Sequence, residues 1–165
     1  MTCAGRSIAV IRRMAVVLGL GAMLALAPSL QAGELHHKVV PADEIAWGPA
    51  PPSLPRGAQV AVLLGNPGEE GPFVLRLKFP AGYVIPPHRH SKDEFLTVIV
   101  GQFAEASGET LDRTASPFLS SASFVYLPAG MPHYAWVEAE TVVQINGVGP
   151  FDVTYIDPKD DPRNQ

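Results

Sequence analysis

The chain has 165 residues, of which 47% are hydrophobic and 17% charged, and its formal net charge is −4. This length suits one domain of ordinary size, and this composition argues against a wholly disordered chain. Glycine (15 residues) and proline (17 residues) are both abundant, which favours short segments joined by turns over long helices.

Residues 1–32 have the features of a secretory signal peptide. Three arginines precede the apolar run MAVVLGLGAMLALA, and the first acidic residue is Glu34. A basic start, a short apolar run and a small residue at the cut predict cleavage after Ala32. The alternative is an uncleaved membrane anchor, but the run is shorter than the roughly 20 apolar residues that span a bilayer. We therefore expect a periplasmic or secreted protein with no membrane attachment after cleavage.

The pair Arg12–Arg13 raises the twin-arginine route, which exports folded proteins. Ile11 stands before the pair, where that route usually has a polar residue, so we favour ordinary secretion. Cleavage would remove three arginines and the only cysteine, Cys3, which leaves nine basic and sixteen acidic residues and a net charge of −7. This charge argues against nucleic acid or anionic lipid as a partner, and the mature chain could form no disulfide.

Residues 33–59 predict an extended arm that lies over the domain. The stretch PADEIAWGPAPPSLPRG contains five prolines, and we expect Ile45, Trp47 and Leu54 to anchor it. A disordered linker is the alternative, but a tryptophan buries a large area when it docks.

Residues 60–157 predict many short β-strands. In PFVLRLKFP, for example, Leu75, Leu77 and Phe79 alternate with polar residues, so they share one face of a strand. Short strands separated by closely spaced turns predict an all-β sandwich or barrel. Residues 158–165 predict a solvated polar tail.

Two of the five histidines lie in the stretch GYVIPPHRHSKDEFLTVIVG. His88 and His90 are two residues apart, so in a strand their side chains share a face. The sequence SKD predicts the turn of a hairpin, after which Glu94 opens the returning strand beside the imidazoles. Two imidazoles and one carboxylate form a facial set of ligands for a divalent metal. The alternative is a polar hairpin surface.

A further histidine follows a rigid turn later in the chain. In YLPAGMPHYAW, two prolines and a glycine precede His133. This imidazole would complete a site of three histidines and one glutamate and leave positions open for water or substrate, which is typical of a catalytic metal. Together the two stretches favour metal binding over the surface alternative.

These stretches resemble the two motifs of the cupin superfamily. The first motif, G-x5-H-x-H-x3-4-E-x6-G, is matched by Gly82, His88, His90, Glu94 and Gly101. The second motif, G-x5-P-x-G-x2-H-x3-N, is matched by Pro128, Gly130 and His133. It departs at both ends, where Ala122 replaces the glycine and Val137 the asparagine.

The resemblance implies one all-β domain, a double-stranded β-helix or cupin jelly-roll barrel, over residues 60–157. It also implies a metal ion inside the barrel near its mouth. Because dimers are common in this superfamily, we also expect a homodimer. The motifs do not identify the metal: iron, manganese, zinc, nickel and copper all suit imidazole and carboxylate ligands.

The residues expected inside the barrel are mostly apolar, which predicts a pocket for a small organic molecule. Tyr83 is the candidate catalytic residue beside the ligands, with packing as its alternative. Two functions stay open. One is a metal-dependent enzyme of the dioxygenase, isomerase or lyase type. The other is a binding module that senses or carries a small ligand or a metal without turnover.

Overall fold

The computed structural model describes Met1 and residues 37–165, so the predicted signal peptide lies outside the described residues apart from Met1. Residues 38–165 form one compact unit. Its strands are β1 (Gly48–Pro49), β2 (Gln59–Leu64), β3 (Gly71–Phe79), β4 (Val84–Arg89), β5 (Glu94–Val100), β6 (Gln102–Ser107), β7 (Leu119–Ser120), β8 (Phe124–Leu127), β9 (His133–Trp136), β10 (Thr141–Gly149) and β11 (Thr154–Tyr155). Two short 3-10 helices, η1 (Ala42–Glu44) and η2 (Pro162–Asn164), lie near its ends.

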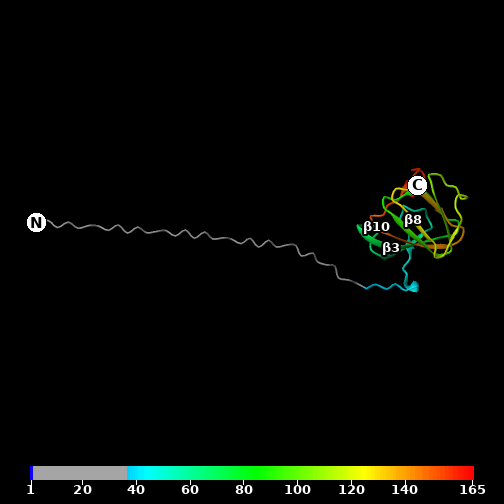
Figure 1. Ribbon diagram of the computed structural model, residues 1–165. Helices are drawn as coiled ribbons and strands as arrows, with labels where there is room; N and C mark the ends of the chain where they lie inside the picture. The colour runs from blue at the N-terminus through cyan, green and yellow to red at the C-terminus, as the bar shows by residue number, and fades with distance from the viewer. Residues whose placement is uncertain (2–36) are drawn as a thin grey trace. The chain divides into compact units, whose positions relative to one another are not determined.

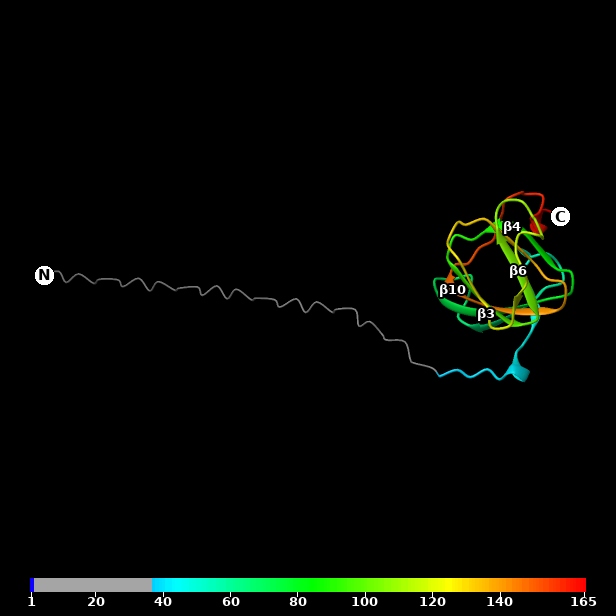
Figure 2. The ribbon, with the colours of Figure 1, turned by 45° about the vertical axis from the view of Figure 1, so that its right-hand side comes forward.

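The strands form two antiparallel sheets. The first sheet has six strands in the order β1-β2-β3-β10-β5-β8, and the second has five in the order β11-β4-β9-β6-β7. Both sheets curve around a common interior (Figures 1 and 2). Strands that follow one another in the chain often lie in opposite sheets, as in a jelly roll. The all-β double-stranded β-helix predicted from the sequence is confirmed.

The alternation predicted in β3 places its apolar side chains in the core. Phe73, Leu75, Leu77 and Phe79 are buried, whereas the residues between them are partly exposed. Strand β10 pairs with β3 along its whole length and contributes buried residues such as Val143 to the same interior. Alternate side chains of a strand point to opposite faces of its sheet, so the buried apolar residues of β3 and β10 lie on the inner face. The inner faces of the two sheets together form an apolar interior.

The predicted hairpin across the sequence SKD is wrong. Strand β4 lies in the five-stranded sheet between β11 and β9, whereas β5 lies in the six-stranded sheet between β10 and β8. The short connection therefore crosses from one sheet to the other instead of joining two paired strands. Glu94 consequently faces the histidines across the interior and is not their neighbour within one sheet.

The proline-rich arm contacts the barrel along residues 47–55. Strand β1 pairs with β2 at the edge of the six-stranded sheet, and the ammonium group of Lys78 lies 4.4 Å from the ring centre of Trp47. Leu54 packs against the core, and the Tyr155 hydroxyl donates to the carbonyl of Ser53 at 2.8 Å. No helix among the described residues is both long and apolar enough to cross a membrane.

Candidate metal centre

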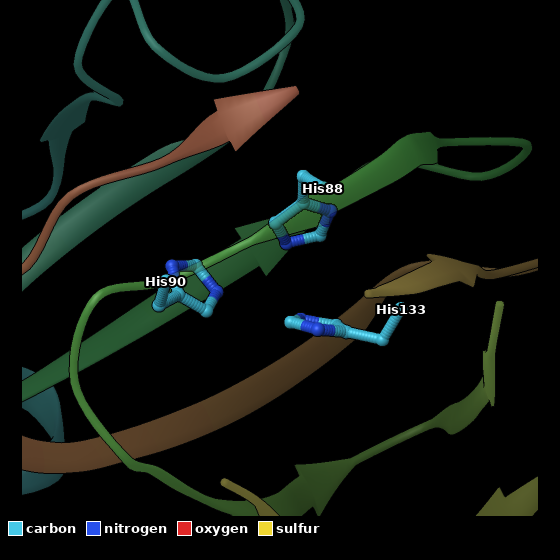
Figure 3. A group of neighbouring side chains, drawn as sticks. All are labelled: His88, His90 and His133. Atoms are coloured by element: carbon cyan, nitrogen blue, oxygen red, sulfur yellow. The ribbon is translucent and has the colours of Figure 1, made fainter. Parts of the chain in front are cut away.

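Three buried histidines converge inside the barrel. His88 lies on β4, His90 follows this strand directly, and His133 opens β9. Their candidate ligand atoms all lie within 4.8 Å of one another, and each residue is at most 6% exposed. Figure 3 shows the three rings turned toward one another. Three imidazoles in this arrangement could hold a metal ion.

The two prolines before His88 shape the local backbone. Ile85 pairs with Ala135 and His88 pairs with His133, so β4 has one more residue than β9 between these two pairs. The extra residue is a β-bulge, which shifts the alternation so that both Ile85 and His88 face inward. Proline has no N–H group to donate to a sheet, so this pair suits a bulge.

Each of the three imidazoles is oriented by a backbone carbonyl. Nδ1 lies 2.8 Å from the Pro86 oxygen in His88, 3.0 Å from the Met131 oxygen in His133, and 2.5 Å from the Asp152 oxygen in His90. A carbonyl oxygen can only accept, so Nδ1 carries the proton in each ring. In His88 and His133 this tautomer leaves Nε2 with a free lone pair, as a metal ligand requires, whereas Nε2 of His90 faces the carboxylate of Glu94.

Glu94 adds a carboxylate to the cluster from the opposite sheet. Its Oε2 lies 3.0 Å from Nε2 of His90 and 3.6 Å from Nε2 of His133. Glu94 is 4% exposed, so this charge lies in an environment with little water. Glu94 thus lies beside two of the three imidazoles, but the group whose ligand atoms all lie within 4.8 Å of one another consists of the histidines alone. The predicted fourth ligand therefore lies at the edge of this group, where its charge favours a cation.

Burial and neighbouring charges shift the histidine pKa values in different directions. Burial, followed by the charges of the two other imidazoles, lowers the pKa of His88 well below its ordinary value. Burial is also the main cause that lowers the pKa of His133. Burial opposes protonation of His90, but its hydrogen bond and charge interaction with Glu94 prevail and raise its pKa. The neutral forms of His88 and His133 are therefore favoured, whereas Glu94 stabilises a proton on His90 that a bound cation would displace.

Backbone and side-chain hydrogen bonds around the motif residues hold these ligands in place, and no sequence pattern predicts them. Asp152 supplies the carbonyl that orients His90, and its carboxylate accepts from both the backbone N–H and the hydroxyl of Ser91. The backbone N–H of Ala129 donates to the Asp93 carboxylate, and that of Gly130 to the His90 carbonyl. These bonds tie the turn before His133 to the segment that carries His90.

The three histidines and Glu94 line a cavity of about 480 Å³. Most of its wall is apolar, with Leu75, Leu77 and Val143 from the six-stranded sheet. The arm closes part of it through Leu54, and Phe151 stacks on the ring of His90 with 4.3 Å between ring centres. The cavity has the size and polarity of a site for a small organic molecule.

Tyr83 takes a position that favours packing. Its hydroxyl donates to the carbonyl of Pro55 at 2.5 Å, its ring stacks on Phe79, and it is absent from the cavity wall. Burial, aided by Tyr155, raises the pKa of Tyr83, so the hydroxyl keeps its proton. A catalytic role for this residue stays a prediction from the sequence alone.

The two departures from the second motif lie outside the cluster. Val137 is buried in the core and donates its backbone N–H to the carbonyl of Tyr83. Ala122 has a φ of 70°, a left-handed conformation in which glycine is unstrained and alanine is not. The glycine of the motif therefore has a backbone reason, and Ala122 keeps the same turn despite the strain.

The fold and the buried histidine cluster define a cupin. Residues 35–152 match the family described as the ChrR cupin-like domain, and the chain belongs to this family. No curated protein matches the chain.

Solved structures share this fold at low sequence identity. An acetylacetone dioxygenase from Acinetobacter johnsonii has a TM-score of 0.59 and 18% identity, over 78% of this chain and 83% of that one. The polyketide cyclase RemF from Streptomyces resistomycificus has a TM-score of 0.60 and 14% identity, over 77% and 90%. An RmlC-like cupin protein from Ralstonia eutropha has a TM-score of 0.59 and 19% identity, over 77% and 76%.

Proposed function

We propose that this protein is a metal-dependent cupin enzyme that converts a small organic molecule inside its barrel. One observation carries the proposal: three buried imidazoles converge on the wall of a mostly apolar cavity of about 480 Å³. A buried cluster of metal ligands that opens onto such a cavity can bring a cation and an organic ligand into contact.

The ligand set in this proposal is His88, His90, His133 and Glu94. The cluster fits a divalent metal because Nδ1 of each ring is engaged by a backbone carbonyl, which leaves Nε2 as the nitrogen for the metal, and because Glu94 brings a negative charge. A metal bound there would act as a Lewis acid, or as a redox centre if it is iron or copper. The protein's own share is to orient the ligands, exclude water and hold the organic molecule against them.

The substrate class follows from the cavity wall and from the structural neighbours. Apolar side chains such as Leu77 and Phe151 would contact the carbon skeleton, and the arm would limit access of water. One neighbour is an acetylacetone dioxygenase and another a polyketide cyclase, so carbonyl and enol compounds are the first candidates. We propose a dioxygenase type of reaction, with isomerase or lyase chemistry as the alternative.

The second candidate function is a binding module without turnover. It is favoured by the described cavity wall, which contains no cysteine, no lysine and no histidine beyond the three candidate ligands, so that Glu105 is the one carboxyl group left to act as a base. Such a module would bind a small ligand or a metal and release it unchanged.

Metal content and oxygen consumption separate the two functions. The purified protein would be assayed for bound iron, manganese, nickel, copper and zinc and then screened with acetylacetone, catechol and a flavonol in an oxygen electrode. A stoichiometric metal together with substrate-dependent oxygen uptake supports the enzyme, and His88→Ala should abolish both. Ligand binding to a protein that never holds a metal would contradict the proposal.

We also propose that the chain is exported and works as a homodimer in the periplasm or outside the cell. Export rests on residues 1–32, and mass spectrometry of the mature protein should find its first residue at Gly33. Self-association is supported by Phe95, Phe124 and Tyr126, which are exposed together on the outer face of the six-stranded sheet. A monomer in light scattering at micromolar concentration would contradict the dimer.

A further inference from the structure

Strand β6 places one carboxylate inside the barrel that the metal cluster does not use. Phe103 and Glu105 line the cavity, whereas Ala104 and Ala106 pack on the other side of the sheet. Glu105 therefore faces the same interior as the histidines. The cavity wall is otherwise mostly apolar, so this carboxyl group is an exception that needs a reason.

The carboxyl group of Glu105 lacks a partner. Among the residues that the structure describes, one buried side-chain oxygen or nitrogen has no hydrogen-bond partner, and this atom is Oε2 of Glu105. Burial, followed by the negative charge of Glu94, raises the pKa of Glu105. A buried polar atom without a partner costs stability, so its presence needs an explanation, and a ligand that supplies the missing partner is one.

The sheet register places Glu105 next to the metal cluster. Strand β6 pairs with β9 so that Ser107 faces His133 and Glu105 faces Ala135. Residues two apart along a strand are separated by about 7 Å. Glu105 is thus one inward-facing position from His133, within the length of a small aromatic or enolic molecule that also reaches the three imidazoles.

We infer that Glu105 determines the specificity of the cavity by accepting a hydrogen bond from the ligand, which is therefore a small, uncharged, mostly apolar molecule with a phenolic or enolic hydroxyl group. This inference rests on the proposed function, because it places the ligand in the same cavity. Two carboxylates face the cavity, Glu94 and Glu105, so ligands that carry a carboxylate are disfavoured. The apolar wall disfavours sugars and other ligands with many hydroxyl groups.

Calorimetric binding to the zinc-loaded full chain tests this assignment, because zinc does not oxidise the probes. Catechol has the hydroxyl groups, and 1,2-dimethoxybenzene has the same skeleton without a donor. A hydrogen bond to a charged group contributes enough that Glu105→Leu should weaken catechol binding by roughly 10–100-fold. The affinity for 1,2-dimethoxybenzene should stay within about threefold, because that probe cannot donate to Glu105. Glu105→Gln should fall between, since its amide oxygen still accepts.

Two controls keep loss of fold apart from loss of specificity. Glu138→Gln changes an exposed glutamate beyond β9 and should leave binding of both probes unchanged. The melting temperature of Glu105→Leu without ligand should equal or exceed that of the wild type, because the variant removes a buried atom without a partner. A residue with a merely structural role would show the opposite shift.

The outcomes are distinct for this inference and for the proposed function. Equal catechol affinity in the wild type and Glu105→Leu, an equal loss for both probes, or no binding of either probe to the wild type would overturn the role of Glu105. Each protein should also bind about one zinc ion, as expected of a single set of four ligands. A wild-type chain that binds no zinc would instead overturn the proposed function.

Discussion

Ala122 is the residue at which this chain departs most clearly from the motif that it otherwise follows. It holds a left-handed backbone conformation with a φ of 70°, and its backbone N–H donates to the carbonyl of Val98 at 2.8 Å. The turn is therefore kept by hydrogen bonding at a cost in backbone strain. Its side chain is exposed, so a change there alters little besides the backbone.

Ala122→Gly should stabilise the fold. Glycine relieves the left-handed strain but adds freedom to the unfolded chain, so the free energy of unfolding should rise by roughly 0.5–1 kcal/mol. Urea denaturation followed by circular dichroism measures this change. An unchanged or lower midpoint would show that the turn is unstrained with alanine.

The opposite change at Gly101 serves as the matched comparison. Gly101 has a φ of 88°, and an added Cβ would lie 2.6 Å from the carbonyl oxygen of Glu140 and 2.6 Å from Oγ1 of Thr141. Gly101→Ala therefore combines backbone strain with a steric clash, and the free energy of unfolding should fall by about 2 kcal/mol or more. A variant as stable as the wild type would show that this turn can move aside.

The pKa shifts of the three histidines predict how the stability of the metal-free protein changes with pH. His88 and His133 have lowered pKa values when folded, so below their ordinary value of 6.5 the unfolded chain binds protons that the folded chain does not. Stability should thus fall as the pH drops from about 7 to 5. His90, whose pKa is raised, opposes this trend, but it is one residue against two.

Denaturation midpoints of the chelator-treated protein across this pH range check the prediction. His88→Asn should show a shallower fall, because it removes the residue whose charged form is least tolerated in the fold. A midpoint that rises on acidification would contradict the pKa directions assigned to the cluster.

At the level of the strands, the sequence patterns predicted which side chains are buried but not which strands pair. Alternation correctly assigned Leu75, Leu77 and Phe79 to the interior, because a strand with one apolar face has one way to bury it. The spacing of the two motifs also predicted that His88, His90 and His133 lie in one cluster. The pairing of strands was different: a short turn is compatible with a hairpin and with a crossing between sheets, and the crossing was missed.

Glu105 and Asp152 were missed for other physical reasons. In QFAEAS the alanines on one side of the strand are small, so hydrophobic alternation does not tell which face is inward. Asp152 reaches His90 through its backbone carbonyl from a position 62 residues away, and a backbone contact needs no particular side chain. Neither contact leaves a local pattern in the sequence.

Tyr83→Phe tests the attachment of the arm to the barrel. The variant loses the hydrogen bond to the Pro55 carbonyl, so the free energy of unfolding should fall by about 1 kcal/mol and proteolysis within residues 48–57 should become faster. Turnover, if found, should change little. A large loss of turnover with unchanged stability would instead assign Tyr83 to catalysis, the role that its sequence position first indicated.

The whole molecule joins an apolar barrel to a polar cluster that lies within it. The apolar core between the two sheets is built, among the described residues, without any of the three histidines. We therefore expect metal removal to leave a folded barrel, unlike the small domains that unfold without zinc.

Metal stoichiometry of the wild type and His88→Ala, measured by mass spectrometry with circular dichroism as the fold control, tests the central claim most directly. The wild type should bind about one divalent metal ion per chain, and the variant should lose it while keeping the β-sheet spectrum. A variant that retains the metal of the wild type, or a wild type that binds none at neutral pH, would contradict the metal centre proposed for His88, His90, Glu94 and His133.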